Sequence, residues 1–178
     1  MIRSAESEDL QDFTTGLSAN GKKEVELIQT YFNDKKLDAI YLSAQKNAQA
    51  TIKDLISNHK NVFVTEEFNE RCIGPRVANL DSFSRRQWQE IEYKLANGES
   101  FVDVTNRMID GLEKVVTNHK DEVSLIVTHS MALASVIHFF DETFDYDEYV
   151  RTNSIYPWIV QMEFEEKTLV SLLEIKAL

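Results

Sequence analysis

A nearly continuous apolar and β-branched stretch, residues 122–128 (EVSLIVT), constrains the fold more than any other part of the sequence. Strands with this pattern are buried on both faces, as in α/β proteins whose sheet carries helices on each side. His129 ends the stretch, and residues 130–140 continue with helical character. We therefore expect a central strand that leads directly into a helix.

The rest of the chain alternates shorter strand and helix patterns. Strands are expected at residues 38–42 and 61–65, with only a stub at residues 1–3. Helices are expected after Ser18, a plausible cap, and at residues 45–57, 82–96 and 100–118. Residues 158–164 and 169–175 flank a polar turn and predict a hairpin. The pattern predicts the α/β class: a three-layer α/β/α sandwich with a mixed, mostly parallel sheet and a C-terminal hairpin.

Composition limits the classes of function. The chain has 178 residues, five Gly, two Pro and no linker-like run, so we expect one domain over residues 1–178. A formal net charge of −11 disfavours nucleic-acid binding, which needs clustered basic residues. We expect no membrane span, because no apolar run is long enough, and a cytoplasmic location, because acidic residues stand where a signal peptide would be apolar. The single cysteine, Cys72, gives no disulfide and no metal cluster.

Candidate site residues follow the predicted strands. In α/β sheets, ligands bind beyond the carboxyl ends of the strands. Arg3 and Ser4 follow the first strand, Asn47 follows the second and His129 follows the central one, while Glu70 lies in an irregular segment that can fold over them. Each signal alone is weak, because a histidine after a strand is more often structural and an isolated Arg or Glu is usually solvated.

The combination is more specific, because short motifs occur in a characteristic order. They are RSAE at 3–6, LSANG at 17–21, SAQKNAQAT at 43–51, FNERCIG at 68–74, GES at 98–100 with Asp103, Val104 and Arg107, VTH at 127–129, and Asn153 before the hairpin. This series resembles the histidine phosphatase superfamily, the phosphoglycerate mutase-like proteins. The resemblance spans nearly the whole chain and implies the same fold.

The resemblance also implies roles for the candidate residues. In this family one His attacks phosphorus, two Arg and a second His bind the phosphoryl group, and an acidic residue protonates the leaving oxygen. Arg3 matches the first phosphate-binding Arg, Glu70 the acid and His129 the second His. Ser4 stands where the nucleophilic His is expected, and Asn47 stands where the second Arg is expected.

These two departures decide the functional expectation. A serine hydroxyl is a poor nucleophile unless a base or a metal activates it. We therefore expect a degenerate family member, a pseudophosphatase, that binds a phosphorylated small molecule or another anion through Arg3, Asn47 and His129. One alternative is a low-activity phosphomonoesterase that uses Ser4, or water, with Arg3 and His129 as phosphate ligands. Another is a non-catalytic protein-interaction module. No cofactor or metal is expected, and the sequence does not name a substrate, a partner or an oligomeric state.

Overall fold

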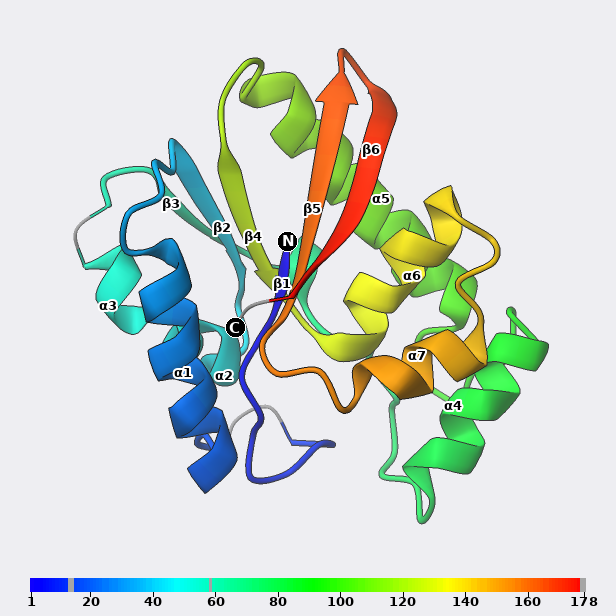
Figure 1. Cartoon of the computed structure of the whole chain (residues 1–178). Helices are drawn as coiled ribbons and strands as arrows, with labels where there is room; N and C mark the ends of the chain where they lie inside the picture. Colours follow the sequence, from blue (N-terminus) through cyan, green and yellow to red (C-terminus); the bar gives the residue numbers. More distant parts are fainter. Residues whose placement is uncertain (13–14, 58, 177–178) are drawn as a thin grey trace.

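A mixed six-stranded sheet forms the centre of the computed structural model, which describes residues 1–12, 15–57 and 59–176 (Figure 1). The strands are β1 (Ile2–Arg3), β2 (Ala39–Ser43), β3 (Val62–Thr65), β4 (Ser124–Thr128), β5 (Trp158–Glu165) and β6 (Thr168–Lys176). Their order is β3-β2-β4-β1-β5-β6. The neighbouring pairs among strands β1, β2, β3 and β4 are all parallel, whereas β5 is antiparallel to both β1 and β6. The predicted central strand and C-terminal hairpin are thereby confirmed.

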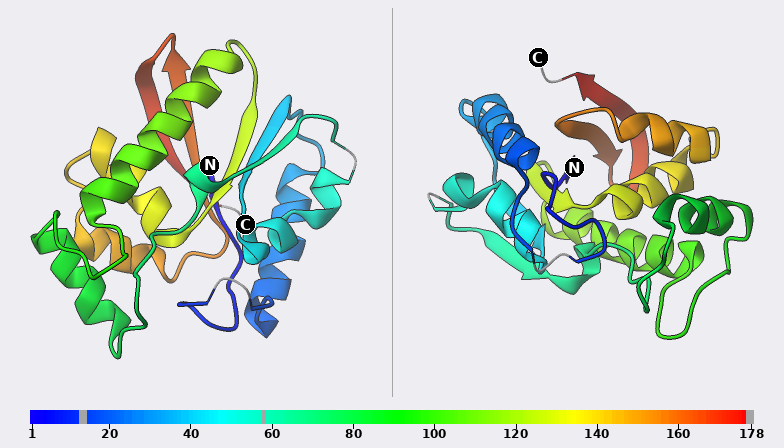
Figure 2. Two further views of the ribbon diagram at one scale, coloured as in Figure 1. Left: turned by 180° about the vertical axis from the view of Figure 1, so that it is seen from behind. Right: turned by 90° about the horizontal axis from the view of Figure 1, so that it is seen from below.

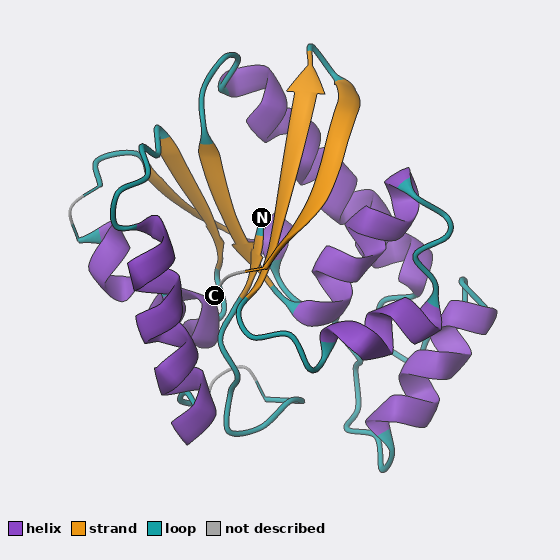
Figure 3. Ribbon diagram, in the orientation of Figure 1, coloured by secondary structure: helices purple, strands orange, loops and turns teal. Residues whose placement is uncertain are grey.

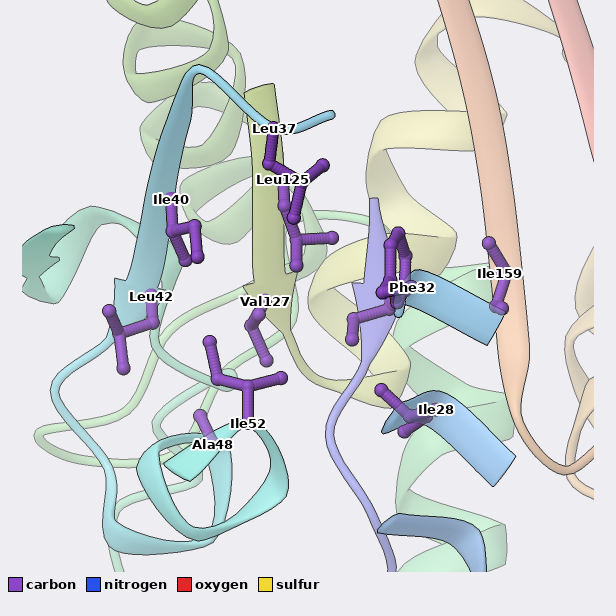
Figure 4. Close-up of a cluster of buried hydrophobic side chains, with 11 residues drawn as sticks. Ile28, Phe32, Leu37, Ile40, Leu42, Ala48, Ile52, Leu125, Val127 and Ile159 are labelled. Atoms are coloured by element: carbon purple, nitrogen blue, oxygen red, sulfur yellow. The ribbon is translucent and has the colours of Figure 1, made fainter. Parts of the chain in front are cut away.

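Helices cover both faces of the sheet, which gives the predicted three layers (Figures 2 and 3). One layer holds α1 (Ala19–Phe32), α2 (Lys46–Thr51) and α3 (Lys53–Ile56), and the other holds α5 (Phe101–Asn118) and α6 (Ser130–Phe140). Figure 4 shows the core under the first layer, where Ile28 and Phe32 of α1 meet Leu125 and Val127 of β4. A second cluster joins α5 and α6 to the opposite face. The β4 side chains therefore alternate between two apolar cores, as their sequence predicts.

Two predicted helix starts are confirmed by their caps. The Ser18 hydroxyl accepts a hydrogen bond from the backbone N–H of Gly21 at the start of α1. Ser100 and Asp103 form a reciprocal capping box at the start of α5. Such caps satisfy backbone donors that the first helical turn leaves free.

Two predicted helices differ from the structure. The expected helix at 45–57 is split into α2 and α3 at Ile52. The Thr51 hydroxyl donates to the Asn47 carbonyl at 2.6 Å, a local bond that bends helices. The expected helix at 82–96 is α4 (Leu80–Gln89), which ends early. There the Gln87 amide donates to the carbonyls of Tyr93 and Glu99, which holds the following chain folded back.

Two short elements were not predicted. A 3-10 helix, η1 (Glu66–Phe68), follows β3, and α7 (Tyr146–Thr152) precedes β5. Ring contacts of Trp88 with His138 and Tyr149 show that α4 and α7 pack beside α6. Among the described residues, no helix is both long and apolar enough to cross a membrane.

Candidate active site

One cavity of about 430 Å³ lies at the carboxyl ends of β1, β2 and β4. All five residues that the sequence singles out line it: Arg3, Ser4, Asn47, Glu70 and His129. The predicted convergence is therefore observed, although these residues are up to 126 positions apart (129 minus 3). Parallel pairing explains it, because β1, β2 and β4 all end at the same edge of the sheet. Lys46, beside Asn47, is exposed and does not line the cavity.

A chain of buried hydrogen bonds runs through the centre of the site. Asn47 Nδ2 donates to Ser4 Oγ at 3.1 Å, and Ser4 Oγ lies 3.0 Å from His129 Nδ1. On the far side of the ring, His129 Nε2 lies 2.8 Å from Ser43 Oγ, which donates to Asn69 Oδ1 at 2.8 Å. Ser4 and His129 are only 5% and 2% exposed, so these bonds form away from bulk water.

The surrounding donors fix the direction of these bonds. The single hydroxyl proton of Ser43 goes to Asn69 Oδ1, which also accepts the N–H of Ala44. His129 Nε2 must therefore carry the proton that is donated to Ser43, and Nδ1 of the neutral ring is left as an acceptor. The Ser4 hydroxyl consequently donates to His129. This is the arrangement of a nucleophile and its base.

The basicity of His129 opposes that use. Complete burial, with a smaller contribution from the positive charge of Arg107, lowers the pKa of His129 from 6.5 to about 3. A general base works best when its pKa lies near the operating pH. The neutral His129 ring can accept a hydrogen bond from Ser4, but it is a weak acceptor for a full proton.

Glu70 is held as the cap of a helix. One of its carboxylate oxygens accepts the N–H groups of Arg71 and Ala132, at 2.7 and 3.0 Å. The other accepts the N–H of Met131 at 2.9 Å. These N–H groups include the first turn of α6, where negative charge is favoured. Glu70 thereby occupies backbone donors that an anionic ligand could otherwise use.

Arg3 is buried and is oriented by the chain before β5. Its guanidinium donates to the carbonyls of Thr152 and Ile155, at 3.1 and 2.6 Å, and lies over the ring of Tyr156. Burial lowers the pKa of Arg3, while Tyr156, Glu24 and other nearby acidic groups raise it. Arginine nevertheless remains charged at neutral pH, so Arg3 brings a fixed positive charge to the pocket.

Sequence reasoning missed a second buried cation, Arg71. Its guanidinium donates to Gln87 Oε1 at 2.6 Å and to Ser84 Oγ at 3.2 Å, and it stacks over Phe83. Its Nε is buried without a hydrogen-bond partner among the described residues. Arg71 lines the same cavity as Arg3. Arg71 directly follows Glu70 in the 68–74 segment, so its position near the site could have been predicted. Its burial could not, because an arginine in a loop is usually exposed to solvent.

The segment that carries Glu70 and Arg71 is held from outside the pocket by Arg107 of α5. One guanidinium nitrogen of Arg107 donates to the carbonyls of Glu67 and Asn69, at 2.8 and 3.1 Å. Its other nitrogens bind both oxygens of Glu99, each at 2.8 Å. Within the described residues, no group of three or more His, Cys, Asp or Glu is arranged to hold a metal ion.

These features define an α/β-sandwich protein with a pocket at the carboxyl edge of its sheet that joins buried guanidinium groups, a histidine and a carboxylate. The comparisons with known proteins agree with this class. The sequence matches the histidine phosphatase superfamily (branch 1) over residues 8–172, so the chain belongs to that superfamily. The matched range includes Asn47, Glu70 and His129 and begins after Arg3 and Ser4.

Individual proteins that resemble this chain share less than a third of its sequence in the matched region. Phosphoserine phosphatase 1 from Hydrogenobacter thermophilus is 29% identical over 133 residues, which cover 67% of this chain and 62% of that enzyme. YhfR from Bacillus stearothermophilus has a similar structure, with a TM-score of 0.74, 20% identity and coverage of 94% of this chain and 91% of that one. A mutant phosphoserine phosphatase from Entamoeba histolytica, in complex with phosphoserine, gives a TM-score of 0.75 at 16% identity, covering 96% and 93%. These structural similarities support the fold.

Proposed function

We propose that this chain is a degenerate histidine phosphatase that binds a phosphorylated or otherwise anionic small molecule and turns it over slowly or not at all. One observation carries the proposal: the Ser4 hydroxyl, at the position where the sequence resemblance leads us to expect the nucleophilic histidine, is held between Asn47 and a neutral His129. Its oxygen lies close to the backbone, and its partner is a weak base. Neither feature favours attack on phosphorus.

Anion binding is supported by the positive charge in the pocket. Arg3 and Arg71 are both buried there, and neither forms an ion pair with a carboxylate in the described part of the chain. A buried guanidinium without a counter-charge is costly, and an anionic ligand would offset that cost. Relatives with similar folds include a glucosyl-3-phosphoglycerate phosphatase in complex with inorganic phosphate, which makes a phosphate group the first ligand to test.

A second candidate rests on the 3.0 Å contact between Ser4 Oγ and His129 Nδ1. This geometry favours a low-activity phosphomonoesterase in which Ser4 Oγ attacks phosphorus while His129 takes the hydroxyl proton. The P–O bond to the alcohol breaks, the alcohol leaves with a proton from His129 or water, and water then hydrolyses the phosphoserine. The lowered pKa of His129 places this candidate second.

The two candidates are separated by measuring aryl phosphate hydrolysis by the wild-type chain and by Ser4→Ala. We expect turnover at the background level in both. Saturable wild-type turnover that Ser4→Ala abolishes would overturn the first proposal and establish the serine mechanism.

Ligand binding is tested separately, by calorimetric titration with inorganic phosphate. We expect binding that Arg71→Gln weakens about tenfold or more, because charge-assisted bonds are lost. Arg85→Gln is the matched control, since Arg85 is exposed and does not line the pocket. If phosphate does not bind to the wild type, the anion-binding proposal fails and the interaction-module alternative gains support.

A further inference from the structure

The cavity of the candidate active site differs in character between its floor and its mouth. Arg3 and Arg71 line it as buried side chains and bring positive charge to the floor. Three aliphatic side chains line the same cavity nearer to solvent. Leu10 is 60% exposed, and Ile73 and Leu80 are partly exposed. We call these three residues the apolar mouth of the cavity.

Leu10 is held in place by the bonds of its two neighbours. Asp9 forms an ion pair with Arg76 at 2.7 Å. The Gln11 side chain donates to the Val77 carbonyl at 3.1 Å and accepts the Val77 N–H at 3.0 Å. These bonds join the loop after β1 to the segment before α4 on both sides of Leu10. Both stretches lie below the carboxyl ends of β1 and β4 in Figure 1.

This fixation distinguishes Leu10 from an ordinary surface leucine. Single exposed leucines are common and need no explanation. Leu10, however, lines a cavity that also contains buried cations, and its backbone is held on both sides. A preorganised apolar side chain loses little conformational freedom when a ligand covers it, so more of the burial contributes to affinity.

The size and the charges of the cavity indicate what can occupy the apolar mouth. A volume of about 430 Å³ is typical of sites for organic molecules much larger than phosphate. Of the charged residues that line the cavity, the two more exposed ones, Glu6 and Asp81, are acidic. A second negative group on a ligand would meet like charge there, which opposes binding. An apolar group would meet the three aliphatic side chains instead.

Tyr156 connects the floor to the outer part of the cavity. Its ring centre lies 4.4 Å from the guanidinium carbon of Arg3, and Tyr156 is itself exposed and lines the cavity. An apolar group that extends from an anion bound at Arg3 therefore begins beside an aromatic ring. Aromatic and aliphatic lining with a few polar groups is the usual composition of a site for an organic ligand.

We propose that the ligand of this site is a phosphate monoester with an apolar ester group. Its phosphate binds at Arg3 and Arg71, and its alkyl or aryl group binds in the apolar mouth. This inference rests on the proposed function and adds the chemical class of the ligand. Leu10 determines the preference, because it is the most exposed of the three aliphatic side chains and has the most surface for a ligand to cover.

The test is calorimetric titration of the complete chain with methyl phosphate and with n-butyl phosphate, which carry the same charge. We expect butyl phosphate to bind at least about tenfold more tightly, because each fully buried methylene contributes about fourfold. 3-Phosphoglycerate, which has a similar length but carries a carboxylate, should bind more weakly than butyl phosphate.

The outcomes separate this inference from the proposed function. If methyl phosphate binds and butyl phosphate binds no more tightly, or if 3-phosphoglycerate binds more tightly than butyl phosphate, the apolar mouth does not select the ester group. The inference is then wrong, while anion binding stands. If none of the three compounds binds, anion binding fails and the inference fails with it.

A matched pair of variants locates the ester group. Leu10→Asn removes an apolar side chain from the mouth, whereas Leu173→Asn makes the same change on β6, at a position that is 53% exposed and outside the cavity. We expect Leu10→Asn to weaken butyl phosphate binding about fivefold and to leave methyl phosphate binding unchanged. Leu10→Met, which keeps an apolar side chain, should retain both. Equal affinities of the two Asn variants for butyl phosphate would contradict the role of Leu10.

Discussion

At the scale of single residues, the pocket joins reactive groups whose properties oppose each other. Ser4 donates its proton to His129, yet burial makes that ring a weak base. Asn47 offers a neutral amide where phosphoryl transfer favours positive charge. Under the proposed function, the site residues are brought together in space but lack the basicity and the charge that phosphoryl transfer needs.

The first prediction is a gain of function. Ser4→His combined with Asn47→Arg should raise aryl phosphate hydrolysis about 10²-fold or more above either single variant, because nucleophile and charge act on one transition state. The matched control is Ser4→His with Lys46→Arg, which adds no charge inside the pocket. Rates are compared after circular dichroism has shown that each variant folds. A folded double variant that remains at background would mean that Asn47 does not occupy the position of the family's second arginine.

The second prediction concerns pH. The pKa of His129 is about 3 in the folded chain and about 6.5 when unfolded, so between these values the unfolded state binds the extra proton. The free energy of unfolding should therefore fall as the pH falls through this window, by at most about 1.4 kcal/mol per pH unit from His129. Urea unfolding of wild type and His129→Gln at pH 7.5 and 5 isolates that contribution. An NMR titration in which the folded His129 ring becomes protonated near pH 6 would contradict the assignment.

At the scale of elements, Glu70 joins a loop to a helix. Its carboxylate accepts backbone N–H groups at the start of α6, directly after His129. The negative charge meets the positive end of the helix dipole and satisfies free donors. Glu70 therefore positions the helix next to the site, in addition to any part it takes in chemistry.

Replacing the charged carboxylate of Glu70 should lower the stability of the fold. We expect Glu70→Gln to lower the free energy of unfolding by about 1–2 kcal/mol, because an amide is a weaker cap than a carboxylate. Glu66→Gln is the control, because Glu66 is exposed and its side chain caps no helix. Urea denaturation at pH 7 compares the two. Equal stability of both variants would show that α6 does not depend on this carboxylate.

The elements also show where sequence reasoning succeeds and where it stops. The central strand and α5 were predictable because burial periodicity and caps are local signals. The break at Ile52 and the early end of α4 were not, because Thr51 and Gln87 decide them through hydrogen bonds that a periodicity pattern does not contain. Convergence of the site residues followed from sheet topology, whereas the burial of Arg71, whose Nε has no hydrogen-bond partner among the described residues, depends on tertiary packing.

At the scale of the whole molecule, residues 1–178 should unfold as one cooperative domain. Both termini contribute to one sheet, since β1 near the start lies beside β5 near the end. Trp88 in α4 and Trp158 in β5 pack in one apolar cluster, so tryptophan fluorescence reports on that cluster, whereas circular dichroism reports on the helices and strands of the whole chain. Urea transitions followed by fluorescence and by circular dichroism should coincide. Two separated transitions would indicate that the chain contains independently folding parts.

The position of Arg107 has a consequence for how such a protein can evolve. Arg107 fixes the Glu67–Asn69 backbone and Glu99 from behind the site, and it touches neither Ser4 nor Asn47. A mutation at Ser4 or Asn47 therefore leaves these anchoring bonds in place. The chemistry of the pocket can therefore change by single substitutions while the loop stays anchored, whereas loss of the Arg107 side chain would release the loop and Glu99 together.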